Sequence, residues 1–243
     1  MRDSLSHFVA EFIGTFALVF VGGAAIMVTA GNPAALLIVA LAHGLVLAVM
    51  VSALMRISGH FNPAVTLGFL ATRRIEAMMA GVYILAQLLG AMAASYVLKA
   101  AMPATVFDAM RGGGQAVAGE IGTGTAILLE AIATFFLVLV VFGTAVDAKA
   151  PKIGGLAIGL TIAADILAIG PLTGASMNPA RSFGPAIASG VFEGQVVYWV
   201  GPIVGGVIAA LVYEHLFMDD DHEPFDHGAV RPLDTEMSVK ARG

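Results

Sequence analysis

Two short apolar stretches of this chain, at about 62–72 and 178–188, each begin with the same tripeptide, Asn-Pro-Ala. The copies are Asn62-Pro63-Ala64 and Asn178-Pro179-Ala180. Proline suits the first turn of a helix, where its missing N–H costs nothing, and Asn is favoured at the N-cap before it. Each copy therefore predicts a helix start. Two copies in similar surroundings indicate an internal duplication.

Six longer apolar segments surround these two stretches, and each approaches the roughly 20 residues that a helix needs to cross the bilayer core. They run over about 7–29, 34–55, 77–101, 125–146, 153–170 and 195–217. Hydrophobic residues make up 58% of the 243 residues and charged residues 12%. Charged residues in soluble domains reach about 25%, so the composition predicts a membrane bundle rather than a soluble core.

The two Asn-Pro-Ala stretches are too short to span, so we expect them to form re-entrant half-helices. Irregular backbone at membrane depth is tolerated only where it is buried in protein or lines a water-filled cavity. The segment 10–16 resembles 129–135, which places three spans in each half with a half-helix between the second and the third. An odd number of spans inverts the second half relative to the first.

The expected fold class is therefore an all-α membrane protein with six transmembrane helices and two half-helices. Its inverted repeats cover about 7–101 and 125–217, within one membrane domain over 1–217. Residues 218–243 are acidic and poor in large apolar side chains, so we expect a disordered tail. His222 and His227 in that tail do not make a convincing metal site, and no metal is expected. No basic cluster suggests nucleic acid.

Basic residues predict how the protein is oriented in the membrane. Six of them fall on one side of the expected topology, namely Arg2, Arg56, Arg73, Arg74, Lys149 and Lys152. The positive-inside rule then places both termini in the cytoplasm. We expect a multi-pass protein of the cell's inner or plasma membrane.

Ionisable side chains inside membrane spans are costly and mark functional positions by default. The candidates here are Glu11, His43, His60, Glu130, Asp165 and Arg181. Arg181 directly follows the second tripeptide, where the first is followed by Val65. Because a guanidinium cannot lose its charge, Arg181 predicts a fixed positive charge in a narrow passage. Tying down a neighbouring loop carbonyl is a second role, compatible with the first.

Glu11 and Glu130 occupy matching places in the two repeats. A proton relay is one interpretation of this pair. We favour the other, in which each carboxylate accepts hydrogen bonds from the loop backbone beside its half-helix, because unwound backbone in lipid needs partners. His60 is interpreted as a loop anchor rather than a proton shuttle. Asp165 receives no role.

These motifs resemble those of the aquaporins, the major intrinsic protein family. The matching segments are 10–15, 58–65, 178–186 and 198–202. The resemblance covers about 7–217 and implies a passive water channel, a homotetramer with a pore in each subunit, no cofactor and no enzymatic activity. A secondary transporter with broken helices and a membrane enzyme are the alternatives. Neither ion-coupling carboxylates nor a catalytic cluster supports them.

The family's outer constriction is made by four positions, which the resemblance places on His43, Ile166, Ala175 and Arg181. Strict water channels of the family usually have Phe at the first position and His at the second, and glycerol channels have Trp and Gly. The set found here is most similar to plant vacuolar (tonoplast) members. In some of those members a loop residue joins the constriction, and that residue would be Gln115 here.

Ser182 and Ala186 stand where glycerol channels have Asp and a basic residue, so water is favoured over glycerol. A glycerol- or metalloid-conducting pore of the same family is the alternative. Ile166 and Ala175 make one wall of the constriction apolar. We therefore expect a small neutral solute, ammonia or urea, to pass besides water.

The resemblance also implies a mechanism for the pore. The two half-helix N-termini meet at the bilayer centre, where Asn62 and Asn178 offer N–H donors to water and the helix dipoles repel cations. Backbone carbonyls complete a ladder of acceptors. They are expected from Gly59, His60 and Phe61 on one side and from Gly174, Ala175 and Ser176 on the other.

Overall fold

The structure is a computed structural model that describes residues 2–218, and this part of the chain contains helices and no strand. Six helices are long and apolar enough to cross a membrane. They are α1 (Arg2–Val28), α2 (Ala35–Leu54), α4 (Ala77–Ala101), α6 (Thr123–Val141), α7 (Gly154–Thr173) and α9 (Gln195–Leu216). A π-helical turn, η2 (Phe142–Val146), extends α6. The prediction of six spans is confirmed. The expected tail, with His222 and His227, lies outside the described residues beyond Met218.

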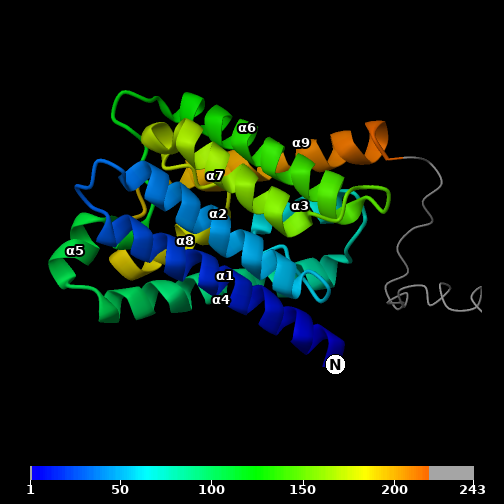
Figure 1. Ribbon diagram of the computed structural model, residues 1–243, viewed down its shortest axis with the longest axis horizontal. Coiled ribbons are helices and arrows are strands. Elements are labelled where there is room, and N and C mark those ends of the chain that lie inside the picture. The colour runs from blue at the N-terminus through cyan, green and yellow to red at the C-terminus, as the bar shows by residue number, and fades with distance from the viewer. Residues whose placement is uncertain (1, 219–243) are drawn as a thin grey trace, which may run out of the picture.

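The two short helices are α3 (Pro63–Ala71) and α8 (Pro179–Ser189), and both lie inside the bundle (Figure 1). Each begins at the proline of its Asn-Pro-Ala motif, with the preceding Asn as an extended N-cap residue. Helix α3 packs against α9, and α8 packs against α4. Each half-helix therefore contacts the last span of the other repeat, which interlocks the two halves.

The spans pair in the same way in both halves. Helix α1 packs along α4, α6 packs along α9, and α2 packs along α7 to join the halves. The α2–α7 crossing is very close, because a Cβ atom on Gly44 would come within 2.6 Å of the carbonyl oxygen of Gly159. Small residues at such crossings let helix backbones approach each other in membranes.

The start of α1 and the end of α9 lie at the same end of the bundle (Figure 1). At this end Arg74, just after α3, donates two hydrogen bonds to Glu214 of α9, at 2.7 and 3.1 Å. The opposite end carries a short helix that the sequence did not predict, α5 (Ala104–Ala109), and the turn η1 (Arg111–Gly113).

Candidate pore

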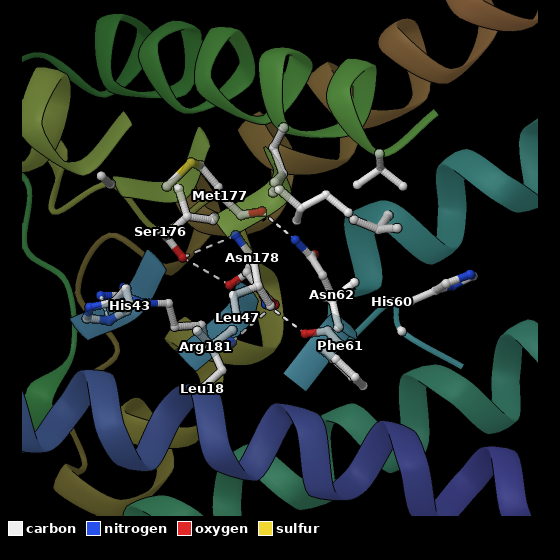
Figure 2. Close-up of a pocket in the computed structure, with 18 of the residues that line it drawn as sticks. Leu18, His43, Leu47, His60, Phe61, Asn62, Ser176, Met177, Asn178 and Arg181 are labelled. Atoms are coloured by element: carbon white, nitrogen blue, oxygen red, sulfur yellow. Dashed lines mark hydrogen bonds between the residues drawn. The ribbon is translucent and has the colours of Figure 1, made fainter. Parts of the chain in front are cut away.

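One cavity runs between the two half-helices and the spans α1, α2, α6 and α7. The largest group of its lining residues is aliphatic: Leu18, Leu47, Val51, Val65, Leu137, Val141, Ile158, Ile162 and Ile166. The polar side chains follow one another along it (Figure 2). His43 and Arg181 lie toward one end, Asn62 and Asn178 lie in the middle, and His60 lies toward the other end. The cavity is thus an apolar passage with one row of polar groups.

Asn62 and Asn178 approach each other across the middle of the cavity (Figure 2). The amide nitrogen of Asn62 donates to the carbonyl of Met177 at 2.8 Å, and that of Asn178 donates to the carbonyl of Phe61 at 2.8 Å. The amide oxygen of Asn62 accepts from the N–H of Ala64 at 2.8 Å, and Asn178 caps α8 in the same way. Both amides are thereby oriented. Each carries two N–H bonds, so one remains for a molecule in the cavity.

Glu11 is fully buried on α1 beside the loop that leads to α3. Its carboxylate accepts the backbone N–H of His60 at 2.8 Å and that of Phe61 at 2.7 Å. The hydroxyl of Ser58 and the amide of Gln87 also donate to it, the latter at 2.6 Å. Four donors on one carboxylate fix the loop against α1.

Glu130 on α6 makes the matching contacts in the second half. It accepts the backbone N–H of Ser176 at 2.9 Å and that of Met177 at 2.7 Å, together with the hydroxyl of Thr173 at 2.7 Å. The carbonyl of Thr173 in turn accepts from the hydroxyl of Tyr198 at 2.8 Å. Both carboxylates therefore bind two consecutive amides just before an Asn-Pro-Ala motif.

The loop residues held in this way adopt unusual backbone conformations. Phe61, Ala175 and Met177 have φ values of 49°, 45° and 53°, in the left-handed region that side chains other than glycine disfavour. Such a residue costs on the order of 1–3 kcal/mol and persists only where its surroundings impose it. The carboxylate–amide bonds of Glu11 and Glu130 restrain Phe61 and Met177, and the N–H of Ala175 donates to the hydroxyl of Thr173 at 3.1 Å.

At one end of the cavity the guanidinium of Arg181 and the ring of His43 are in direct contact, with 2.7 Å between Nη2 and Nε2. The other ring nitrogen, Nδ1, lies 2.8 Å from the carbonyl of Val39. Since a carbonyl accepts only, the geometry assigns the proton to Nδ1 and makes Nε2 the acceptor of the Arg181 bond. Both nitrogens of His43 are therefore occupied.

Ile166 and Ala175 also line the cavity, so all four residues assigned to the outer constriction surround the same passage. Gln115 lies against the guanidinium of Arg181. With its amide turned to satisfy both neighbours, its oxygen accepts from Nε of Arg181 at 3.3 Å and its nitrogen donates to Ser182 at 2.9 Å. Gln115 supports Arg181 without being among the lining residues.

Five of the six residues expected in the acceptor ladder line the cavity. Gly174 is not among the lining residues, whereas Met177 is. Gly174 ends α7 in the left-handed conformation, with φ 81° and its N–H bonded to the carbonyl of Gly170. Leu18 also lines the cavity without having been singled out. Leu18 lies about two turns after Glu11 on the same face of α1, and this spacing could have identified it as a lining residue from the sequence.

Two titratable residues lie apart from the central row. The ring of His60 packs against Phe69, with 4.2 Å between ring centroids, and its Nδ1 lies 3.1 Å from the hydroxyl of Thr66. Asp165 is buried on α7, does not line the cavity, and its Oδ2 has no hydrogen-bond partner among residues 2–218. We have no physical account of Asp165. Within the same residues, no three His, Asp or Glu side chains are grouped to hold a metal ion.

Six spans around a narrow passage lined by oriented donors and acceptors define a membrane channel. The chain belongs to the major intrinsic protein family, whose sequence model, described as Major intrinsic protein, matches residues 2–213. Members of this family are integral multi-pass membrane proteins that act as channels and not as enzymes.

Named relatives are similar over most of the chain. Probable aquaporin TIP3-2 of Arabidopsis thaliana is 42% identical over 250 residues, covering 96% of this chain and 92% of that protein. Aquaporin TIP4-4 of Zea mays is 46% identical over 229 residues, covering 88% of each. The X-ray structure of the aquaglyceroporin from Plasmodium falciparum matches with a TM-score of 0.67 and 26% identity, covering 88% of this chain and 96% of that one.

Proposed function

We propose that the chain conducts water passively through the cavity between α3 and α8. The observation that carries this proposal is the crossed bonding of Asn62 and Asn178, which leaves one oriented N–H donor on each amide at the centre of an apolar passage. A water oxygen that accepts from both amides points its own hydrogens outward in both directions. Such a water cannot relay a proton along the file.

Ions are excluded by fixed positive charge in this proposal. The N-termini of α3 and α8 face the middle of the passage and carry the positive ends of their helix dipoles. Arg181 adds a full charge where the passage is narrowed by His43, Ile166 and Ala175. Cations, hydronium included, therefore meet two successive barriers, whereas neutral water meets none.

The remaining site residues have supporting roles. The carbonyls of Gly59, His60, Ala175 and Ser176 act as water acceptors, while those of Phe61 and Met177 orient the two Asn amides. Glu11 and Glu130 are structural carboxylates that hold the loops. A proton relay through them is disfavoured, because their oxygens already accept bonds from the loop backbone.

We further propose that a small neutral solute, ammonia or urea, passes with water. Ile166 and Ala175 give one apolar wall, and the one acceptor of His43 is occupied by Arg181. The constriction therefore has few polar groups that require a hydrogen-bond partner, so a solute that forms fewer hydrogen bonds with it than water does can still pass. A glycerol- or metalloid-selective pore is the alternative. It would show as glycerol flux exceeding urea flux in reconstituted vesicles.

Replacing Ile166 with His tests the role of the apolar wall. Ile166→His adds a second polar ring to the constriction that His43 also lines, so we expect water flux to stay within about twofold of the parent and ammonia or urea flux to fall about tenfold. The measurement is stopped-flow light scattering of proteoliposomes with each solute in turn. Ile166→Leu, which keeps the wall apolar, should behave like the parent. A parent protein without urea or ammonia flux above empty liposomes contradicts the proposed solute range.

Orientation and assembly complete the proposal. Residues 1–217 form one channel domain whose termini face the cytoplasm, in the cell's inner or plasma membrane. Arg56 follows the end of α2, Arg73 and Arg74 follow the end of α3, and Arg74 bonds to Glu214 near the end of α9, which supports this orientation. Because the chain has no native cysteine, single introduced cysteines with impermeant labels test the orientation.

The family resemblance supports a homotetramer. Native mass spectrometry tests the assembly, and a monomer would contradict it.

A further inference from the structure

Helix α1 has a recess at Gly22 that is filled by the ring of His43. A Cβ atom built on Gly22 would overlap Nε2 of His43 and would lie 2.5 and 2.6 Å from two of the ring carbons. These separations are far inside van der Waals contact. Any residue larger than glycine at position 22 must therefore displace the imidazole ring from its present place.

The ring of His43 is restrained from its other sides as well. Its Nδ1 is bonded to the carbonyl of Val39 on its own helix, its Nε2 is bonded to Arg181, and only 1% of the residue is exposed. The open space beside the ring is the cavity that it lines. A ring pushed away from α1 therefore moves into the passage and loses its alignment with Arg181.

The same face of α1 has a second recess, at Gly14. A Cβ atom there would overlap the ring of Phe61, while Leu18, between the two glycines, lines the cavity. Gly14 and Gly22 are thus about 12 Å apart along the helix. Counted from the matching carboxylates, α6 has Ala133 and Val141 at these two places, and Val141 itself lines the cavity. The recess at the constriction is therefore specific to the first repeat.

We propose that Gly22 is a positioning residue that sets the width and the selectivity of the constriction, by letting the ring of His43 lie back against α1 at the wall of the passage. The role in selectivity rests on the proposed conduction of water and small neutral solutes. No contact between Gly22 and the permeating molecule is involved, because the glycine acts only through His43.

Gly22→Ala is the direct test, with Gly23→Ala as the matched control. A Cβ atom on Gly23 would come closest to the terminal methyl of the flexible Leu98 side chain, at 2.8 Å, and the nearest backbone atom, the carbonyl oxygen of Gly112, would be in ordinary contact at 3.7 Å. Both changes favour helix equally, since Ala has the higher helix propensity. We expect Gly22→Ala to lower urea flux about tenfold and water flux by a smaller factor, about threefold. Gly23→Ala should match the parent in both.

A double variant separates action through His43 from general damage to α1. In a His43→Ala background the added methyl of Gly22→Ala has no ring to displace, so its effect on water flux should shrink to within about twofold. If the single variant does not accumulate, recovery of folded protein in the double variant reports the same collision. An equal loss with and without His43, or no change in the single variant, overturns the proposal.

The water measurements also separate this proposal from the proposed solute range. A parent that passes water but neither urea nor ammonia refutes the solute range alone, and the water flux of the four variants still decides the role of Gly22. A parent that passes no water refutes the proposed function itself, and Gly22 then has no selectivity to set.

Discussion

Glu130→Ala is expected to abolish water conduction and to lower sharply the yield of folded protein. The change leaves the N–H groups of Ser176 and Met177 and the hydroxyl of Thr173 without their acceptor in the interior of the bundle. Each buried donor left unsatisfied costs about 1–3 kcal/mol. Three of them approach the whole stability of an ordinary domain, about 5–15 kcal/mol. Yield of monodisperse protein in detergent and osmotic water flux are the two measurements.

Glu120→Ala is the control for this prediction, because Glu120 is an exposed carboxylate in the loop before α6. It should leave both yield and water flux unchanged. The yield and the water flux of Glu130→Gln should lie between those of Glu130→Ala and Glu120→Ala. An amide keeps one acceptor oxygen but presents a donor to the other backbone N–H. Parent-like water flux from Glu130→Ala would show that the loop before α8 does not depend on this carboxylate.

Arg181→Val is expected to let cations or protons through while water flux persists. Arg181 is a buried charge at the constriction, and two unit charges about 4 Å apart repel by about 4 kcal/mol at an effective dielectric constant of 20. Removing that repulsion should raise proton or sodium flux at least about tenfold, with the helix dipoles as the remaining barrier. An internal pH dye and a sodium-sensitive dye in proteoliposomes report the two fluxes.

Arg111→Asn is the matched control, because it also removes an arginine. The side chain of Arg111, in η1, is 40% exposed and pairs with Glu193. Asn also tolerates the φ of 50° at this position better than most residues. We expect this variant to stay as ion-tight as the parent. An Arg181→Val channel that leaks no more than Arg111→Asn would contradict the electrostatic account of ion exclusion.

The features of the fold that follow from local physics could be predicted from the sequence. Six spans follow from apolar length, and the starts of α3 and α8 follow from the capping preferences of Asn and Pro. Helix α3 begins at Pro63 and α8 at Pro179, as the motif predicts. The short helix α5 was missed because a six-residue helix carries too little periodicity to recognise.

The finer geometry of the site depends on contacts between distant segments. The contact of His43 with Arg181, and the recess at Gly22 that admits the ring, join three elements that no local pattern links. The use of the carbonyls of Phe61 and Met177 as acceptors for the Asn amides likewise requires the two half-helices to meet. These contacts become visible only in the packed structure.

The central claim is that the passage between the two Asn residues conducts water and refuses protons. Its most direct test combines osmotic shrinkage of proteoliposomes, followed by stopped-flow light scattering, with an internal pH dye under an imposed proton gradient. We expect shrinkage at least about tenfold faster than in empty liposomes, with no faster dissipation of the gradient. Shrinkage at the rate of empty liposomes, or a gradient that collapses with the water flow, would contradict the account.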